Sequence, residues 1–186
     1  METIEEEGKK HSTVLRTFRL SSTLDAALRK DALRKKVGKN ALVTSILDKY
    51  VEWDSIVADF GYLTVPPEMI AKLIGGLDKE SIISIAKQVS KKVAASLPLW
   101  YGKADLEAVL KYMEISIKYT GARMPQRIER QSNVIHVFVY QPYDDNGAAW
   151  VRAFNTTLIE SVLGYPPKIV EHENSLETII ELKEVT

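Results

Sequence analysis

The segment 14–36, VLRTFRLSSTLDAALRKDALRKK, constrains the fold most, because its periodicity changes from that of a strand to that of a helix. Successive side chains of a strand point to opposite faces, so residues 14–20 separate into two sets. One predicted face carries Val14, Arg16, Phe18 and Leu20. The other carries Leu15, Thr17 and Arg19. The segment therefore predicts a short strand with one mainly apolar face.

Two helices are predicted after this strand. Ser21 and Ser22 are residues that cap helix starts, and Ser22 with Asp25 has the spacing of a capping box. A helical stripe follows at Leu24, Ala27, Leu28 and Ala32. Residues 37–39 interrupt the pattern. A second helix is predicted from about Asn40, with Leu42, Val43, Ile46, Leu47, Tyr50, Val51 and Trp53 facing inward.

A strand and two short helices form a unit too small to be stable alone. About 45 residues bury little apolar surface, and a lone strand leaves its backbone groups unpaired. Pairing with the same segment of a second chain removes both defects. We therefore expect an antiparallel two-stranded ribbon and four helices that share one core.

The charge of the chain is unevenly distributed, although the formal net charge is zero. Residues 9–53 contain 11 Lys and Arg against 4 Asp and Glu. Residues 54–186 contain 14 against 17, and the first eight residues add four acidic side chains. A basic module in a neutral protein favours a partner that bears phosphate.

The segment 14–53 resembles the ribbon-helix-helix family of DNA-binding proteins, which includes the Arc and methionine repressors. The resemblance is carried by RTFRLSSTLDAAL, a short turn, and NALVTSILDKYVEW. It implies that outward strand side chains read bases in the major groove, here Leu15, Thr17 and Arg19. It also implies that the start of the second helix binds DNA phosphate, here Gly38, Lys39 and Asn40. Three positions depart from the family pattern: Leu15 is not polar, Gly38 replaces a Ser or Thr cap, and Lys36 replaces a glycine.

Physical chemistry supports these roles independently. A two-stranded ribbon fits the major groove, arginine bonds guanine with two hydrogen bonds, and free amides at a helix start attract phosphate. Arg19 is the strongest candidate for a base contact. Arg16 either reaches phosphate from the edge of the ribbon or pairs with a carboxylate. Two other interpretations stay open: a dimerisation device without a DNA role, and an intrachain sheet edge followed by two surface helices.

The rest of the chain predicts a helix-rich α+β domain. FGYLTVPPEM marks a junction, so we expect a flexible acidic N-terminus at 1–12, a DNA-binding domain at 13–58 and a second domain at 59–186. We expect a helix that Gly75 and Gly76 end, a helix that Asp78 caps and Pro98 stops, and a helix from 103 to about 120. The period then alternates, which predicts a ββαββ unit. Its hairpins are expected at 127–130 with 134–140 and at 168–172 with 178–182, around a helix at 147–163. The result would be a four-stranded sheet covered by helices on one face.

No catalytic, metal or cofactor site is expected. The chain has no cysteine, and its histidines His11, His136 and His172 are scattered. The run Asp144, Asp145 and Asn146 precedes a helix and is better explained by capping than by cation binding. No phosphate-binding loop or nucleophile elbow occurs, so we expect no enzyme. No apolar run reaches the roughly 18 residues of a membrane span, and the acidic N-terminus is not a secretion signal, so a cytoplasmic protein is expected.

These patterns together predict a homodimeric transcription regulator that binds double-stranded DNA. The second domain is expected to sense a small-molecule effector or to join dimers into higher oligomers, which would raise avidity. The alternative is an antitoxin-type protein whose C-terminal domain binds a partner protein. A third hypothesis, an enzyme tethered to DNA, has no candidate residue.

Overall fold

The computed structural model describes residues 14–58, 65–120, 126–140 and 145–182. The chain divides into two compact units, Met1–Leu47 and Asp48–Thr186. The expected acidic N-terminus at 1–12 lies outside the described residues. The expected boundary between 58 and 59 stays a prediction.

The first unit contains helix α1 (Ser22–Lys35) and most of helix α2 (Lys39–Lys49). The cap of α1 is Ser21, whose hydroxyl accepts a hydrogen bond from the Leu24 amide at 3.2 Å. The helix cap is therefore Ser21, one residue before the Ser22 that the predicted capping box used. Lys36 ends α1 in the left-handed conformation, at φ 55°, which is the position where a glycine was expected.

The segment 14–20 is extended and forms no strand in this single chain. All seven of its side chains are exposed, including Leu15 at 88% and Phe18 at 70%. Among the described residues of this unit, only Ala32 and Leu42 are buried. The predicted helices are thus confirmed, while the ribbon, which needs a second chain, stays a prediction.

The second unit begins with a π-helical turn, η1 (Tyr50–Asp54), which continues into α3 (Ser55–Val57). Four longer helices follow: α4 (Pro67–Gly75), α5 (Lys79–Tyr101), α6 (Leu106–Thr120) and α7 (Asp145–Leu163). Asp78 caps α5 as predicted, since its Oδ1 accepts from the Ser81 amide at 2.8 Å. Pro98 does not stop α5, contrary to the prediction: the helix continues to Tyr101 and ends at Gly102, whose φ is +76°.

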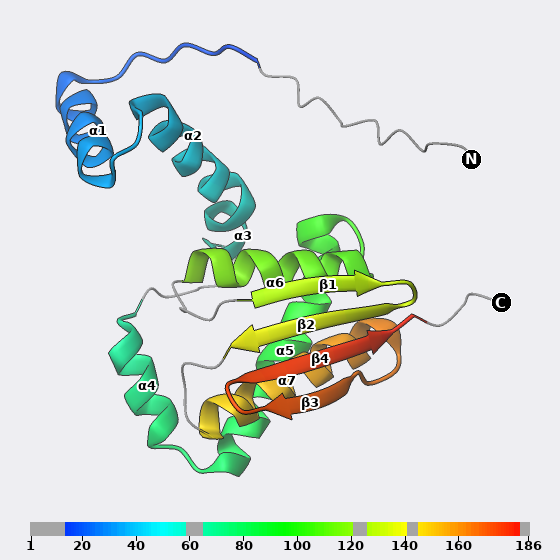
Figure 1. Cartoon of the computed structure of the whole chain (residues 1–186). Coiled ribbons are helices and arrows are strands. Elements are labelled where there is room, and N and C mark those ends of the chain that lie inside the picture. The colour runs from blue at the N-terminus through cyan, green and yellow to red at the C-terminus, as the bar shows by residue number, and fades with distance from the viewer. Residues whose placement is uncertain (1–13, 59–64, 121–125, 141–144, 183–186) are drawn as a thin grey trace, which may run out of the picture. The chain divides into compact units, whose positions relative to one another are not determined.

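The strands are β1 (Gln126–Gln131), β2 (Val134–Tyr140), β3 (Lys168–His172) and β4 (Ser175–Glu181). They form one antiparallel sheet in the order β1-β2-β4-β3, which Figure 1 shows. Both predicted hairpins are confirmed, although β4 begins three residues earlier than expected. The order places β1 and β3 at the two edges of the sheet.

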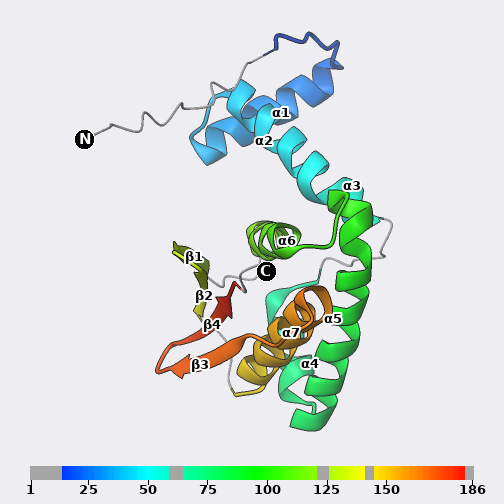
Figure 2. The same ribbon diagram turned by 90° about the vertical axis from the view of Figure 1, so that its right-hand side faces the viewer.

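The core lies between the sheet and helices on one of its faces, as Figure 2 shows for α6 and α7. On β2, the alternating residues Ile135, Val137 and Val139 point into this core, with exposed fractions of 2, 0 and 4%. The helices and β4 contribute buried partners that include Leu97, Val109, Leu158, Leu176 and Ile180. The predicted α+β class and the one-sided sheet are therefore confirmed for this unit. No helix in the described ranges is long and apolar enough to cross a membrane.

Candidate functional site

The predicted base-reading residues Leu15, Thr17 and Arg19 are all exposed in the extended segment 14–20. Arg16, from the other predicted face, donates to the carbonyl of Leu15 at 3.1 Å and makes no ion pair with the described residues. Alternate residues of 14–20 point to opposite faces only if the segment forms a strand. It forms no strand in this single chain.

The predicted phosphate-binding residues Gly38, Lys39 and Asn40 lie at the start of α2 and are exposed. The carbonyl of Gly38 accepts from the Leu42 amide at 3.0 Å, and apart from its two neighbours in the chain no described residue comes within 4 Å of where a Cβ on Gly38 would be. The start of α2 is therefore exposed, and exposed amides at a helix start are what anion binding there requires.

Lys39 has an intrachain partner that the sequence pattern did not indicate. Its Nζ lies 2.6 Å from Oδ1 of Asp25 in α1, and Arg29 pairs with the other oxygen of Asp25 at 3.1 Å. The hydrogen bond from Lys39, and then that from Arg29, lowers the pKa of the Asp25 carboxyl. Part of the positive charge at the start of α2 is therefore neutralised within the chain.

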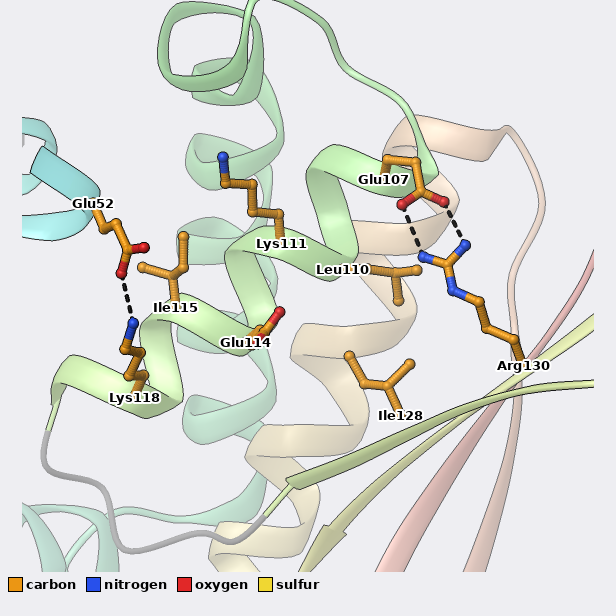
Figure 3. A pocket seen from close by; sticks show the side chains of 9 residues that line it. All are labelled: Glu52, Glu107, Leu110, Lys111, Glu114, Ile115, Lys118, Ile128 and Arg130. Atoms are coloured by element: carbon orange, nitrogen blue, oxygen red, sulfur yellow. Dashed lines mark hydrogen bonds and ion pairs between the residues drawn. The ribbon is translucent and has the colours of Figure 1, made fainter. Parts of the chain in front are cut away.

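The second unit carries a charged groove between α6 and β1, with a volume of about 580 Å³. Figure 3 shows two ion pairs at its ends, Glu52 with Lys118 and Glu107 with Arg130. The described residues that line it are Glu52, Glu107, Glu114, Lys111, Lys118, Arg130, Leu110, Ile115 and Ile128. Three acidic and three basic side chains balance, so the groove favours neither anions nor cations by net charge.

One end of the groove is organised around the Glu52 carboxylate. Lys118 donates to its Oε2 at 2.7 Å and the Tyr119 hydroxyl donates to the same oxygen at 2.5 Å. The hydrogen bond from Lys118, followed by that from Tyr119, holds the pKa of Glu52 below its usual value. The same contact with Glu52 raises the pKa of Lys118. Both groups are therefore charged at neutral pH.

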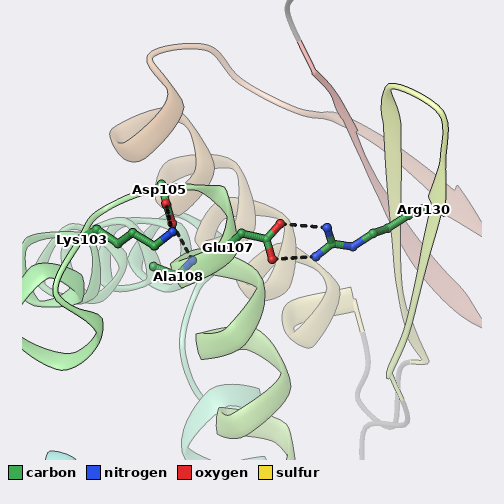
Figure 4. Close-up of polar contacts among 5 residues, drawn as sticks. All are labelled: Lys103, Asp105, Glu107, Ala108 and Arg130. Atoms are coloured by element: carbon green, nitrogen blue, oxygen red, sulfur yellow. Dashed lines mark hydrogen bonds and ion pairs between the residues drawn. The ribbon is translucent and has the colours of Figure 1, made fainter. Parts of the chain in front are cut away.

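The other end ties α6 to the edge strand β1. Two guanidinium nitrogens of Arg130 donate to the two oxygens of Glu107, each at 2.8 Å, as drawn in Figure 4. Beside this pair, Asp105 accepts from the Ala108 amide at 3.0 Å and lies 2.5 Å from Lys103. Asp105 thereby caps α6, which explains why the helix begins at 106 and not at the expected 103.

Chemically, this groove is suited to docking. Between the two ion pairs lies Glu114, whose carboxylate makes no hydrogen bond or ion pair with the described residues. Its neighbours Leu110 and Ile128 provide apolar surface. A cationic side chain flanked by an apolar one on a partner would match this arrangement. Glu107 and Arg130 are 23 residues apart, and no local pattern in the sequence indicated that they would meet.

The uncovered face of the sheet holds a second polar cluster, which sequence reasoning missed. His136 Nδ1 lies 2.7 Å from Oε1 of Glu177, and His172 Nε2 lies 2.8 Å from Oε2 of the same carboxylate. His136 was expected to be an ordinary strand residue without a metal role, and that expectation stays a prediction. No grouping of three or more side chains arranged to hold a metal ion was found in the ranges that the structure describes.

Comparisons with known proteins leave the sequence and the structure as the basis for function. No family model matches the chain, and no curated protein or solved structure matches it either. The resemblance of 14–53 to ribbon-helix-helix proteins therefore depends on the residues quoted above.

Proposed function

We propose that this protein is a cytoplasmic, homodimeric, sequence-specific DNA-binding transcription regulator. The observation that carries the proposal is the apolar surface that its first unit leaves exposed in a single chain. Phe18 is 70% exposed, and Leu24 and Ile46 are each 47% exposed. These residues belong to the strand face and helix stripes that the sequence pattern directs inward. A second copy of the same unit is the partner that would cover them.

Backbone chemistry supports the same partner. The segment 14–20 is extended and forms no strand, so its amides and carbonyls lack ladder partners among the described residues. Antiparallel pairing with the same segment of a second chain would satisfy these groups. Because the two segments are identical, the contact is self-complementary, as twofold symmetry requires. The ribbon and the shared core would then form together.

The opposite face of such a ribbon would meet the DNA major groove. Its side chains would be Leu15, Thr17 and Arg19, of which Arg19 has the fork geometry that guanine recognition uses. Gly38, Lys39 and Asn40 would bind backbone phosphate through the start of α2. Arg16 would contact phosphate from the ribbon edge. The excess of 11 basic over 4 acidic residues in 9–53 would attract DNA before any specific contact forms.

The second unit would act as a ligand-sensing or oligomerisation domain. A folded sheet-and-helix domain is larger than DNA reading requires, and it carries both a charged groove and a second pocket with a mostly apolar lining. Joining two dimers on adjacent half-sites would raise avidity without changing any single contact. If the second unit senses a ligand, binding of that ligand would change the affinity of the protein for DNA.

The charged groove favours a second candidate function, an antitoxin-type protein whose C-terminal domain binds a partner protein. The open carboxylate of Glu114 and the apolar Leu110 and Ile128 would accept a basic and apolar segment of that partner. Glu114→Lys should then abolish partner binding and leave DNA binding unchanged. The two functions can therefore be separated by one substitution.

The experiment that tests the DNA proposal is selection of duplexes from a random library by the full-length protein at near-physiological salt, with sequencing of the retained pool. An enriched inverted repeat is the expected result, because a twofold ribbon reads two equal half-sites. Salt-sensitive retention without an enriched sequence would overturn specific reading. Failure to retain any duplex would reject DNA binding itself.

A further inference from the structure

A second cavity of about 230 Å³ lies within the second unit, apart from the charged groove. Its walls come from α5, α6 and α7 and from strands β1 and β2. They include Tyr112, Met113, Gln126, Val139, Trp150 and Phe154. A cavity of about 150 Å³ is large enough for benzene. The present cavity therefore has room for one substituted aromatic ring.

The aromatic walls suit a flat ligand. Phe154 stacks between two other rings: its centroid is 6.3 Å from that of Tyr112, at 26°, and 6.3 Å from that of Trp150, at 16°. Rings with such small interplanar angles present roughly parallel faces. An aromatic ligand gains from offset stacking on these faces in addition to the burial of its apolar surface.

One polar group of this wall has no partner among the described residues. Both Nε2 and Oε1 of Gln126 are buried, and neither makes a hydrogen bond with any residue that the structure describes. A buried amide without partners destabilises the folded chain, because folding removes the hydrogen bonds that water supplies. Such groups are rare in folded proteins and are often explained by a function. Gln126 is the first residue of β1 and lines the cavity together with the aromatic residues.

The charge of the lining restricts the ligand further. Among the residues that the structure describes, no Asp, Glu, Lys, Arg or His lines the cavity. Burying an ionised ligand against this lining without a counter-charge would be costly, which favours a neutral ligand. The Gln126 amide has an NH2 group that donates hydrogen bonds and a carbonyl oxygen that accepts them. The group that complements it best also has one donor and one acceptor. A primary carboxamide has this property.

We propose that this cavity is a binding site for a neutral, single-ring aromatic carboxamide, which Gln126 recognises through two reciprocal hydrogen bonds. The amide nitrogen and oxygen of Gln126 are not accessible to solvent. Recognition therefore includes a rotation of the Gln126 side chain toward the ligand. The last torsion of glutamine is broad and allows this rotation. Ser116, on the same wall, already donates its hydroxyl to the Met113 carbonyl at 3.0 Å, which leaves it able to accept.

This inference deepens the ligand-sensing part of the proposed function and rests on it only for the coupling to DNA. Ligand binding is measured without DNA, so its failure and the failure of DNA binding are distinguishable. A site that binds ligand in a protein that retains no duplex would support the inference and reject the regulator.

The test is titration of the full-length protein with benzamide by isothermal calorimetry, with tryptophan fluorescence as a second readout because Trp150 lines the cavity. Acetophenone, which has the same number of heavy atoms and accepts but cannot donate, is the matched probe. We expect benzamide to bind about tenfold more tightly than acetophenone, since acetophenone leaves the amide oxygen unpaired. Benzoate, which is charged, should not bind.

The variant Gln126→Leu should remove this preference, so that benzamide binds no better than acetophenone. It should also raise the melting temperature of the unliganded protein, because it removes an unpaired buried amide. Gln126→Met provides a second apolar variant, and Gln131→Leu, at the exposed end of the same strand, is the control that keeps the preference. Absence of benzamide binding to the wild-type protein, or equal affinity in wild type and Gln126→Leu, would overturn the proposal.

Discussion

Arg130 of β1 and Glu107 of α6 face each other with two parallel hydrogen bonds of 2.8 Å. The pair fastens an edge strand to the helix packed beside it. It also raises the pKa of Arg130 and, through the hydrogen bond from Arg130, lowers that of Glu107. Because both side chains are more than half exposed, this contact orients β1 more than it stabilises the fold.

Replacing Arg130 by Ala should therefore lower the free energy of unfolding by no more than about 1 kcal/mol. Urea unfolding of wild type, Arg130→Ala, Glu107→Ala and the double variant measures the coupling between the two side chains. Arg127→Ala, which removes an ion pair within β1 at 3.0 Å, is the matched control. A coupling energy well above this range would mean that the pair is shielded from solvent.

The Glu177 carboxyl should contribute to the pH dependence of the free energy of unfolding. Burial by itself would raise the pKa of this carboxyl, but hydrogen bonds from His136 and His172 outweigh burial, and the net pKa is lowered from 4.5. The folded state therefore binds its proton less readily than the unfolded state. The stabilisation is fully present above about pH 4.5 and is lost as the pH falls through the folded pKa.

We expect Glu177→Gln to be less stable than wild type at pH 6 and to approach wild type as the pH is lowered toward 3. Denaturant unfolding at a series of pH values measures the difference. Glu173→Gln, in the exposed turn between β3 and β4, should follow the wild-type curve. A difference that grows on acidification would contradict the assignment of the lowered pKa to Glu177.

Phe18→Asp should dissociate the dimer that we propose. The side chain is 70% exposed in a single chain and would lie in the shared core, where an unpaired charge is costly. Sedimentation velocity should give a dimer for wild type and a monomer for the variant. Leu15→Asp, on the opposite face of the segment, is the control and should stay dimeric. A wild-type monomer at all concentrations would reject the shared core.

Arg19 and Lys39 should differ in how they affect DNA binding. Arg19→Ala should cost about 1–3 kcal/mol on the selected sequence and relax one base position in each half-site. Lys39→Ala should weaken binding to all sequences alike and reduce its salt dependence. Asp25→Asn, which frees Lys39 from its intrachain partner, should strengthen binding to all sequences. Equal losses on every duplex for Arg19→Ala would remove it from base reading.

Local patterns predicted the elements well where one signal dominated. The alternation in β2 gave the correct inward face, and both hairpins of the sheet were found. The proline rule failed at Pro98. The residue before it, Leu97, is fully buried, and Trp100, two residues after it, stacks on Tyr112 of α6 with the ring centroids 5.6 Å apart. Tertiary packing outweighed the local cost of a proline inside a helix.

The site residues of the second unit were less predictable for a different reason. The contact between His136 and Glu177 depends on the pairing of β2 with β4, and the strand order β1-β2-β4-β3 cannot be read from the spacing of hydrophobic residues. The Glu107–Arg130 pair depends on the packing of α6 beside β1, which the sequence pattern does not indicate either. Gln126 begins β1 one residue before the predicted strand, so its burial was not foreseen. In the first unit, α1 is present where it was predicted, yet Leu24 and Ala27 of its predicted inward stripe are exposed in the single chain. The second chain that we propose would cover them.

The two edges of the sheet have a consequence for aggregation. Edge strands are templates on which other chains can add, and charged side chains discourage such growth. Here β1 carries Arg127, Glu129 and Arg130, and β3 carries Lys168 and Glu171. The extended segment 14–20, by contrast, exposes large apolar side chains beside its two arginines. Growth by strand pairing is thereby discouraged at the two edges of the sheet. In the dimer that we propose, strand pairing would take place at the N-terminal segment instead.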